Sequence, residues 1–435
     1  MVRHWQAALC ALLALWPLTA SAQKPGTSVA ISDVAAAQLL IANRRYDVAR
    51  KLLERDLTAR PHDSELLFLL ASVHVAQKDY DGAIALFRRI LAGAPNAERV
   101  RLELARAFFL KGDYDNAERQ FRFARAGDIP DSVKTNIDRF LAAIYRLREW
   151  RYNFSLALAP DTNENAGPSA SQVTIFGLPF TLNPGARRQS GIGAAGDING
   201  EWSPLLTGNI KARLGGDFTR LEYSGGQFDD MTVSGYGGPE FLFSDWDVSL
   251  LATGFDRWYA NRPYLTGAGG KLALEVGIAS DLLVAGSVGA QKLDDKFLPQ
   301  QSGMLYSIEA RPTYVLTPSS LVQLAGGFDR QEAEAAPFAY SSTWLGGGYQ
   351  QDLPLGFTVG VQPTFYATRY DAVLAAFGRA RHDNAVMLAF TVLNRRLVYH
   401  GFTPRFSYVF TDQHSNIPLF SYDRSEFQIG LTSLF

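Results

Sequence analysis

Residues 148–163 read REWRYNFSLALAPDTN, and the spacing of the apolar residues changes inside this stretch. Up to Glu149, in residues 131–149, apolar side chains recur at helical spacing. From Tyr152 to Leu158 an apolar side chain stands at every second position, with small or polar residues between. Because strand side chains point alternately to two faces, this alternation is typical of a β-strand. The stretch therefore predicts a helical domain up to residue 149 and a β-domain from residue 150.

The alternation continues to the C-terminus and predicts fourteen strands. They cover residues 151–160, 188–202, 209–223, 229–243, 246–259, 264–279, 282–296, 303–316, 321–334, 339–352, 357–371, 383–394, 397–411 and 422–435. Six connections are short, namely Ser203–Gly208, Ser244-Asp245, Ser280-Asp281, Thr317–Ser320, Leu353–Gly356 and Arg395-Arg396. They alternate with connections that are often longer, such as 161–187, 372–382 and 412–421. This arrangement predicts an antiparallel transmembrane β-barrel, closed because backbone groups in lipid must all be paired.

The last strand carries a second signal for the membrane. Apolar residues alternate from Phe427 to Leu431, and the chain ends in Phe435. Such a strand resembles the insertion signal of bacterial outer-membrane proteins, so we expect Phe435 to serve barrel assembly. The partners expected here are the barrel assembly machinery and outer-membrane lipid. Both termini of the barrel are expected on the side of the short turns, as an even strand count also requires, which predicts that the helical domain lies in the periplasm.

The helical domain repeats itself every 34 residues. The coinciding positions are Tyr46, Tyr80 and Tyr114; Asp47, Asp81 and Asp115; Ala37, Ala71 and Ala105; Ala49, Ala83 and Ala117; and Leu53, Phe87 and Phe121. Small residues let paired helices approach, the bulky residue fills the groove, and Pro61 and Pro95 end two units. This pattern resembles the tetratricopeptide repeat (TPR). It predicts an α-solenoid of three repeats and a capping helix over residues 23–149.

The first helix of each repeat suggests a binding surface, because TPR stacks bind peptides or proteins on the concave face that these helices build. Two sets of equivalent positions are candidates for contact with a protein client: Gln38, Ser72 and Arg106, and Ile41, Val75 and Phe109.

The N-terminus is expected to be a signal peptide over residues 1–22. Arg3 and His4 precede an apolar run at 7–18, which is too short to span a bilayer. Ala20-Ser21-Ala22 then offers small residues for cleavage before Gln23. Export directs the chain to the periplasm, the outer membrane or beyond.

The composition of the 435 residues excludes several classes of protein. The one Cys, Cys10, excludes a disulfide framework, and the six His show no zinc-ligand spacing. A net charge of −1 argues against a nucleic-acid partner. A mean hydropathy of −0.06 argues against a bundle of transmembrane helices.

No motif in the sequence argues for an enzyme, a cofactor or a metal. The run Gly191-Ile-Gly193-Ala-Ala-Gly196 matches a dinucleotide fingerprint only as a string, because no βαβ unit surrounds it. Asp229-Asp230 and Asp294-Asp295 stand beside expected loops, where we expect solvated charge.

The barrel opens with a run that is more specific, from Asn153 to Asn163 with Pro160 and Asp161 near its end. A TPR domain joined to a fourteen-stranded barrel that opens in this way resembles the surface lipoprotein assembly modulator family, the outer-membrane translocators of type XI secretion. The resemblance implies that Asn153, Pro160, Asp161 and Asn163 belong to a family motif. It also implies a protein client, either a surface lipoprotein or a secreted haem- or metal-binding protein, that is moved from the periplasm to the cell surface. Periplasmic chaperones would be further partners.

Two other functions fit the same layout. One is an exopolysaccharide-export porin with a TPR scaffold, and the other is a passive solute porin, in which the TPR domain has no role. Sugar export predicts aromatic side chains in the lumen, whereas protein export predicts a smoother wall of Gly, Ser and Thr. The alternation favours the smoother wall.

Overall fold

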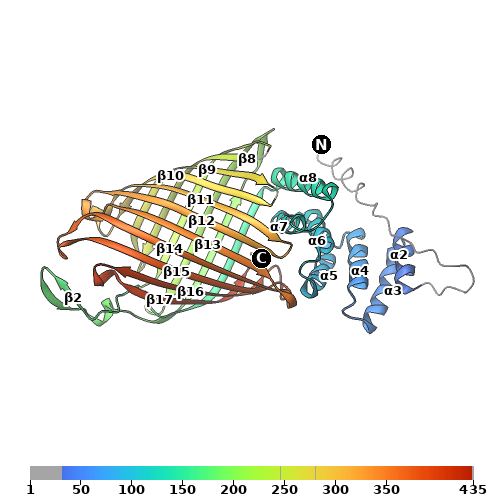
Figure 1. Ribbon diagram of the computed structural model, residues 1–435, viewed down its shortest axis with the longest axis horizontal. Coiled ribbons are helices and arrows are strands. Elements are labelled where there is room, and N and C mark those ends of the chain that lie inside the picture. The colour runs from blue at the N-terminus through green and yellow to red at the C-terminus, as the bar shows by residue number, and fades with distance from the viewer. Residues whose placement is uncertain (1–31, 245, 280, 434–435) are drawn as a thin grey trace, which may run out of the picture.

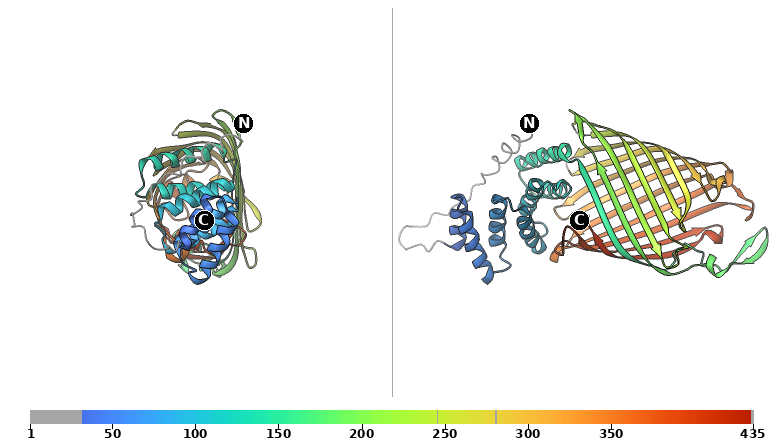
Figure 2. Two further views of the ribbon diagram at one scale, coloured as in Figure 1. Left: turned by 90° about the vertical axis from the view of Figure 1, so that its right-hand side faces the viewer. Right: turned by 180° about the vertical axis from the view of Figure 1, so that it is seen from behind.

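The computed structural model describes residues 32–244, 246–279 and 281–433. Within them, a stack of helices is followed by a β-barrel, and the helices lie over one end of the barrel (Figures 1 and 2). The expected signal peptide and Phe435 lie outside the described residues. The last helix ends at Leu147 and the first strand begins at Trp150.

Seven α-helices are present in the described part of the chain. They are α2 (Asp33–Ala42), α3 (Tyr46–Ala59), α4 (Ser64–Ala76), α5 (Tyr80–Gly93), α6 (Glu98–Lys111), α7 (Tyr114–Arg125) and α8 (Asp131–Leu147). The predicted small and bulky repeat positions form their common core. All nine are fully buried: Ala37, Ala49, Leu53, Ala71, Ala83, Phe87, Ala105, Ala117 and Phe121. The prediction of a TPR solenoid is therefore confirmed.

The turns inside the repeats show the same regularity. Arg44, Lys78 and Gly112 occupy equivalent positions, and all three have a positive φ, of 57°, 64° and 87°. Only Gly112 adopts this conformation without steric cost from a Cβ atom. Asp79 and Asp113 follow two of these residues and cap the next helix, because their carboxylates accept backbone N–H groups of Gly82 and Asn116.

Fourteen long strands of the described chain close into an antiparallel barrel. They are β1 (Trp150–Asp161), β4 (Gly191–Trp202), β6 (Ile210–Tyr223), β7 (Asp230–Leu242), β8 (Trp246–Tyr259), β9 (Arg262–Ala279), β10 (Leu282–Asp295), β11 (Gly303–Thr317), β12 (Ser320–Ala333), β13 (Tyr340–Asp352), β14 (Phe357–Leu374), β15 (Arg379–Asn394), β16 (Thr403–Ser415) and β17 (Tyr422–Thr432). A short strand, β5 (Leu205–Thr207), pairs with the start of β6. Each long strand pairs with its neighbours in sequence, and β1 pairs with β17 to close the ring. The predicted fold class is confirmed.

The structure corrects three details of the expected strands. The turn expected at Arg395-Arg396 extends to residue 402, because a tight turn with positive φ at His400 and Gly401 precedes β16. Strands β14 and β15 run further than expected and shorten the loop at 372–382. The long first loop contains a hairpin of β2 (Gln172–Ile175) and β3 (Leu178–Thr181).

The two faces of the barrel wall differ as the alternation predicted. Leu156 and Leu158 of β1 point outward and are 55% and 63% exposed, as lipid-facing side chains are in a barrel without its bilayer. The intervening residues face the lumen. A search of the described helices finds none that is both long and apolar enough to cross a membrane.

Candidate functional site: the barrel seam and mouth

The run that opens the barrel forms one side of its closing seam. Strand β1 pairs with β4 along its whole length and with β17 on its other edge. The residues paired with β17 run from Ser155 to Leu158 and resume at Asp161. Pro160 lies in the interruption and has no N–H to donate to the ladder. The seam is therefore weakened at Pro160.

Asp161 ties the far end of the seam together. Its side chain is 1% exposed and accepts hydrogen bonds from Arg424 of β17, Nη2 at 2.6 Å and Nε at 2.9 Å. The hydroxyl of Tyr223, at the end of β6, donates to the same carboxylate at 2.7 Å. A buried carboxylate needs a charged partner and hydrogen bonds, and Arg424 and Tyr223 supply both to Asp161. This pairing could not be predicted, because the sequence does not show which residues lie beside Asp161.

Asn163 organises the loop that follows. It is fully buried, and its amide nitrogen donates to the carbonyl oxygens of Gly167 and Asp423, both at 2.9 Å. Its amide oxygen accepts the N–H of Gly167 at 2.8 Å. A Cβ at Gly167 would lie 2.6 Å from the backbone of Arg187, so the loop requires glycine there. Asn163 thus joins the first loop to β17.

Asn153 lies at the opposite end of the seam, close to the C-terminus of the chain. Its side-chain oxygen accepts a hydrogen bond from the hydroxyl of Ser433 at 3.2 Å. The backbones of Phe154 and Ser433 are also joined, by the Ser433 N–H that donates to the Phe154 carbonyl at 2.9 Å. All four residues of the opening motif therefore lie along β1 or directly after it, and three of them bond to the chain from Asp423 to Ser433.

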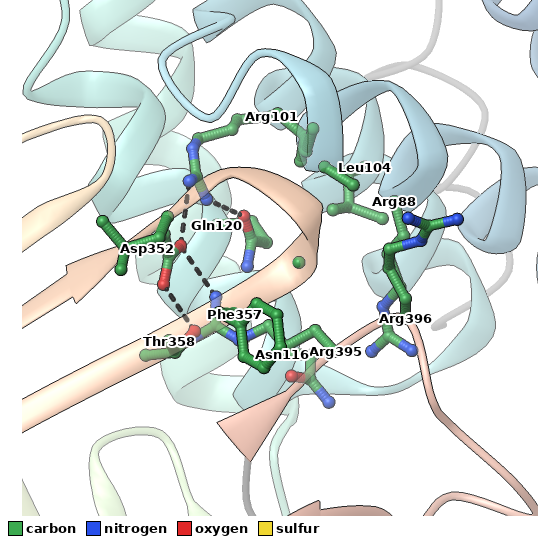
Figure 3. Close-up of a pocket in the computed structure, with 14 residues that line it drawn as sticks. Arg88, Arg101, Leu104, Asn116, Gln120, Asp352, Phe357, Thr358, Arg395 and Arg396 are labelled. Carbon is green, nitrogen blue, oxygen red and sulfur yellow. Dashed lines mark hydrogen bonds and ion pairs between the residues drawn. The ribbon is translucent and has the colours of Figure 1, made fainter. Parts of the chain in front are cut away.

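The helices are fixed to the barrel mouth by a buried ion pair (Figure 3). Arg101 of α6 donates through Nη2 to Asp352, the last residue of β13, at 2.9 Å. Both side chains are below one-tenth exposed. Arg395 donates to the same Asp352 oxygen at 2.8 Å, and the Thr358 hydroxyl to the other at 2.9 Å. Asp352 thereby joins two barrel turns to the solenoid.

A second attachment lies at the end of α8. Lys211 of β6 donates to the carbonyl oxygens of Tyr145 and Arg148, both at 2.8 Å, and the Tyr145 hydroxyl donates to Asp247 of β8. The Arg148 side chain turns back to α7, where it pairs with Glu118 at 2.6 Å. The C-terminal end of α8 is therefore bonded both to the barrel and to α7.

The expected client-binding residues lie elsewhere on the solenoid. Gln38 is exposed, and Ser72 donates to the carbonyl of Phe68 within α4 at 2.9 Å. Arg106 pairs with Glu103 of its own helix at 2.9 Å. The three apolar candidates pack in part against the helical core: Ile41, Val75 and Phe109. The structure thus places three polar candidates at or near the surface and three apolar ones between helices.

The lumen carries charged and aromatic side chains. Arg213 pairs with Glu201 at 2.6 Å, and Lys271 with Glu309 at 3.4 Å. The strand register places Trp344 and Tyr366 on the same face as Glu309. The lumen wall therefore carries larger, charged and aromatic side chains, and the prediction of a wall made mainly of Gly, Ser and Thr is wrong.

Two of the acidic residues that were expected to be solvated are buried. Asp229 is 3% exposed and pairs with Arg220 at 2.8 Å, so the expectation of a solvated charge there is wrong. Asp295 is 5% exposed and accepts two backbone N–H groups of the next loop, so it is also structural. The described residues contain no group of three His, Cys, Asp or Glu side chains arranged to hold a metal ion.

The fold and the mouth together define a class of protein: a transmembrane β-barrel of the outer-membrane type with a TPR domain docked on one end. A family model described as surface lipoprotein assembly modifier matches residues 150–435, and a tetratricopeptide repeat model matches residues 34–98. The chain belongs to the surface lipoprotein assembly modifier family, which confirms the resemblance seen in the sequence.

Individual relatives are distant. Surface lipoprotein assembly modifier 2 of Haemophilus influenzae is 21% identical over 310 residues, which cover 69% of this chain and 63% of the relative. The chain thus spans less than two thirds of that relative's length.

Two solved structures are similar to separate parts of the chain. The type III secretion chaperone SycD of Yersinia enterocolitica, with a peptide of the translocator YopD, is 19% identical with a TM-score of 0.26 and covers 28% of this chain and 97% of its own. The outer-membrane channel DcaP of Acinetobacter baumannii is 5% identical with a TM-score of 0.39 and covers 65% of this chain and 97% of its own.

Proposed function

We propose that this protein is an outer-membrane translocator that receives a protein client in the periplasm and delivers it to the cell surface. The observation that carries the proposal is the docking of the solenoid over the end of the barrel where β1 begins and β17 ends. A client that enters from this end meets the helices before the lumen. The family description supports a surface lipoprotein as the client.

The orientation rests on the connections between strands. The turns near the helices are mostly short, whereas the opposite end carries the long loop between Asp161 and Gly191. Outer-membrane barrels have short periplasmic turns and longer external loops. This difference supports a periplasmic position for the solenoid.

The solenoid would act by concentrating its client. A tethered binding surface at the mouth raises the local concentration of a ligand without tight affinity. Gln38, Ser72 and Arg106 are the polar side chains proposed to meet the client. Passage would then be biased by differences in binding or folding of the client on the two sides of the membrane.

The test is deletion of the gene, followed by surface labelling of a candidate lipoprotein client. We expect the client to be made and exported to the periplasm but absent from the surface, with uptake of a small antibiotic hardly changed. Gln38→Ala with Arg106→Ala should reduce surface delivery, while the matched pair Lys51→Ala with Glu54→Ala, on the exposed side of α3, should not. A client that reaches the surface normally without the protein contradicts the proposal.

Export of a polysaccharide is a second candidate because of the lumen aromatics. Trp344 and Tyr366 lie with ring centres 6.5 Å apart, and Tyr340 and Tyr370 lie 5.4 Å apart. Aromatic faces of this kind can stack on sugar rings. Loss of surface polysaccharide in the deletion strain, with normal delivery of the client, would favour this second function.

A further inference from the structure

The attachment of the solenoid to the barrel at Asp352 holds more positive than negative charge. Three guanidinium groups surround the single carboxylate of Asp352: Arg101 at 2.9 Å, Arg395 at 2.8 Å and Arg119 of α7 at 3.7 Å. Thr358 and Gln120 complete the hydrogen bonds around Asp352 and Arg101 without adding charge. The carboxylate of Asp352 therefore neutralises only one of the three guanidinium charges around it. Because these groups are largely buried, the remaining positive charge is energetically unfavourable.

Two of these three arginines also keep hydrogen-bond donors without an acceptor. Each guanidinium nitrogen of Arg101 donates one hydrogen bond, from Nε to Pro95, from Nη1 to Gln120 and from Nη2 to Asp352. In contrast, Nε and Nη2 of both Arg119 and Arg395 are buried and make no hydrogen bond. Buried donors of charged groups are nearly always satisfied in folded proteins, so these four atoms indicate a missing acceptor.

A pocket lies at this junction, and Arg395, one of the two arginines with unbonded donors, lines it (Figure 3). Its volume is about 40 Å³, enough for a few waters or one tetrahedral oxyanion. The polar part of its wall includes Arg101, Asp352 and Arg395, and two further arginines, Arg88 and Arg396, line it as well. The remaining wall is largely apolar, with Leu91, Leu104 and Phe357 among its residues.

The protonation behaviour of the arginines agrees with this geometry. Burial lowers the pKa of Arg119, Asp352 raises it, and the neighbouring Arg101 lowers it further. Burial likewise lowers the pKa of Arg101 against the effect of Asp352. A second anion would relieve the repulsion between these groups.

We propose that this pocket is a binding site for a phosphate group, which joins the solenoid to the barrel mouth. A guanidinium group presents paired N–H donors that match two oxygens of a phosphate. Arg101 comes from the solenoid and Arg395 from the barrel turn, and both line the pocket, so an anion held by both would strengthen the junction. Asp352 competes for the same donors.

The phosphate could belong to a lipid headgroup or to a free anion. Apolar side chains on the same two turns are exposed, with Leu355 at 61%, Leu397 at 60% and Tyr399 at 77%. Such residues at the rim of a barrel suit the interface of the bilayer, where headgroup phosphates lie. The probes are therefore inorganic phosphate and short-chain phosphatidylglycerol, each titrated separately.

The experiment measures thermal unfolding and calorimetric binding of the full chain in detergent at constant ionic strength. We expect both probes, but not chloride, to raise the Tm saturably. A lower saturating concentration for phosphatidylglycerol identifies the lipid headgroup, and a response to inorganic phosphate alone identifies the free anion.

Four variants distinguish a phosphate site from a general effect on folding. Arg395→Gln should weaken phosphate binding by about 10-fold or more, because it removes charged donors from the pocket wall. Arg119→Gln should weaken binding less, because Arg119 lies beside Asp352 but does not line the pocket. Asp352→Asn should lower the Tm without phosphate and bind phosphate more tightly than the wild type, since the competing carboxylate is gone. Arg187→Gln, on the first loop at the other end of the barrel, should change neither.

A variant that merely misfolds cannot bind phosphate more tightly. Tighter binding by Asp352→Asn therefore distinguishes a phosphate site from a general loss of folding. The proposal is overturned if phosphate raises the Tm equally in the wild type and Arg395→Gln, if acetate acts as strongly as phosphate, or if no saturable binding is found.

Discussion

Asp161 shows how one side chain can hold a barrel closed. Strand β4 lies between β1 and β6, yet Tyr223 of β6 and Arg424 of β17 both reach the Asp161 carboxylate across the inner wall. Backbone pairing along the seam is interrupted nearby at Pro160, so this side-chain cluster reinforces the ladder where it is weakest. Asp161 thus links β6 and β17 to the end of β1.

We expect Asp161→Asn to lower the thermal stability of the folded barrel. Removing one partner of a buried ion pair costs about 3–5 kcal/mol, because the other charge stays buried. The measurement is the temperature at which the heat-modifiable band shifts on a gel. Asp256→Asn is the control, since Asp256 is an exposed side chain near the same end. An unchanged transition in Asp161→Asn would mean that the cluster does not support the seam.

The lowered pKa of Glu118 makes the stability of the solenoid depend on pH in the acid range. Burial would raise the pKa of Glu118, but ion pairs with Arg122 and Arg148 outweigh burial and lower the pKa to about 2. A lowered carboxyl pKa stabilises the fold above the unfolded value of 4.5, and this contribution is lost as the pH falls toward 2. The contribution is roughly 3 kcal/mol from the size of the shift.

The prediction is a Tm that falls between pH 5 and pH 3 in the wild type and falls less in Glu118→Gln, as followed by circular dichroism. Glu65→Gln, at an exposed position of α4, should keep the wild-type dependence. Identical pH profiles for Glu118→Gln and the wild type would contradict the assigned role.

The secondary-structure elements followed from the sequence wherever periodicity determines them. The 34-residue repeat and the alternation located the helices and most strands, because burial of one face imposes both patterns. The turn before β16 was missed, since His400 adopts a left-handed conformation that its residue type does not predict. The roles of Asp229 and Asp352 could not be predicted from the sequence either. The strand register brings Arg220 to Asp229, and docking of the solenoid brings Arg101 to Asp352.

The repeat turns offer an element-level prediction. Lys78 is exposed and has a φ of 64°, at the position that Gly112 occupies in the next repeat. Lys78→Gly should stabilise the solenoid by about 0.5–1 kcal/mol, because glycine has no Cβ to clash in this conformation. Thermal unfolding of the full chain measures the gain, and Lys78→Ala, which keeps the Cβ, should show none. A loss of stability in Lys78→Gly would contradict this explanation.

At the scale of the whole molecule, the solenoid has its own core and touches the barrel through few buried pairs. The helical core contains no barrel residue. We therefore predict that residues 23–149, expressed alone, are soluble and strongly helical by circular dichroism. A disordered spectrum would show that the solenoid depends on the barrel for its fold.

The seam has a consequence for the order in which the molecule forms. Every other pair of the long strands joins strands that follow one another in the barrel sequence, but the hydrogen bonds between β1 and the end of the chain join residues 263 to 280 positions apart. Contacts of such high sequence separation carry the largest loop-closure entropy and form late. The ring can therefore close only after synthesis has reached β17, and a chain that stops short keeps two unpaired strand edges. The topology thus allows the barrel to close only when all fourteen long strands are present.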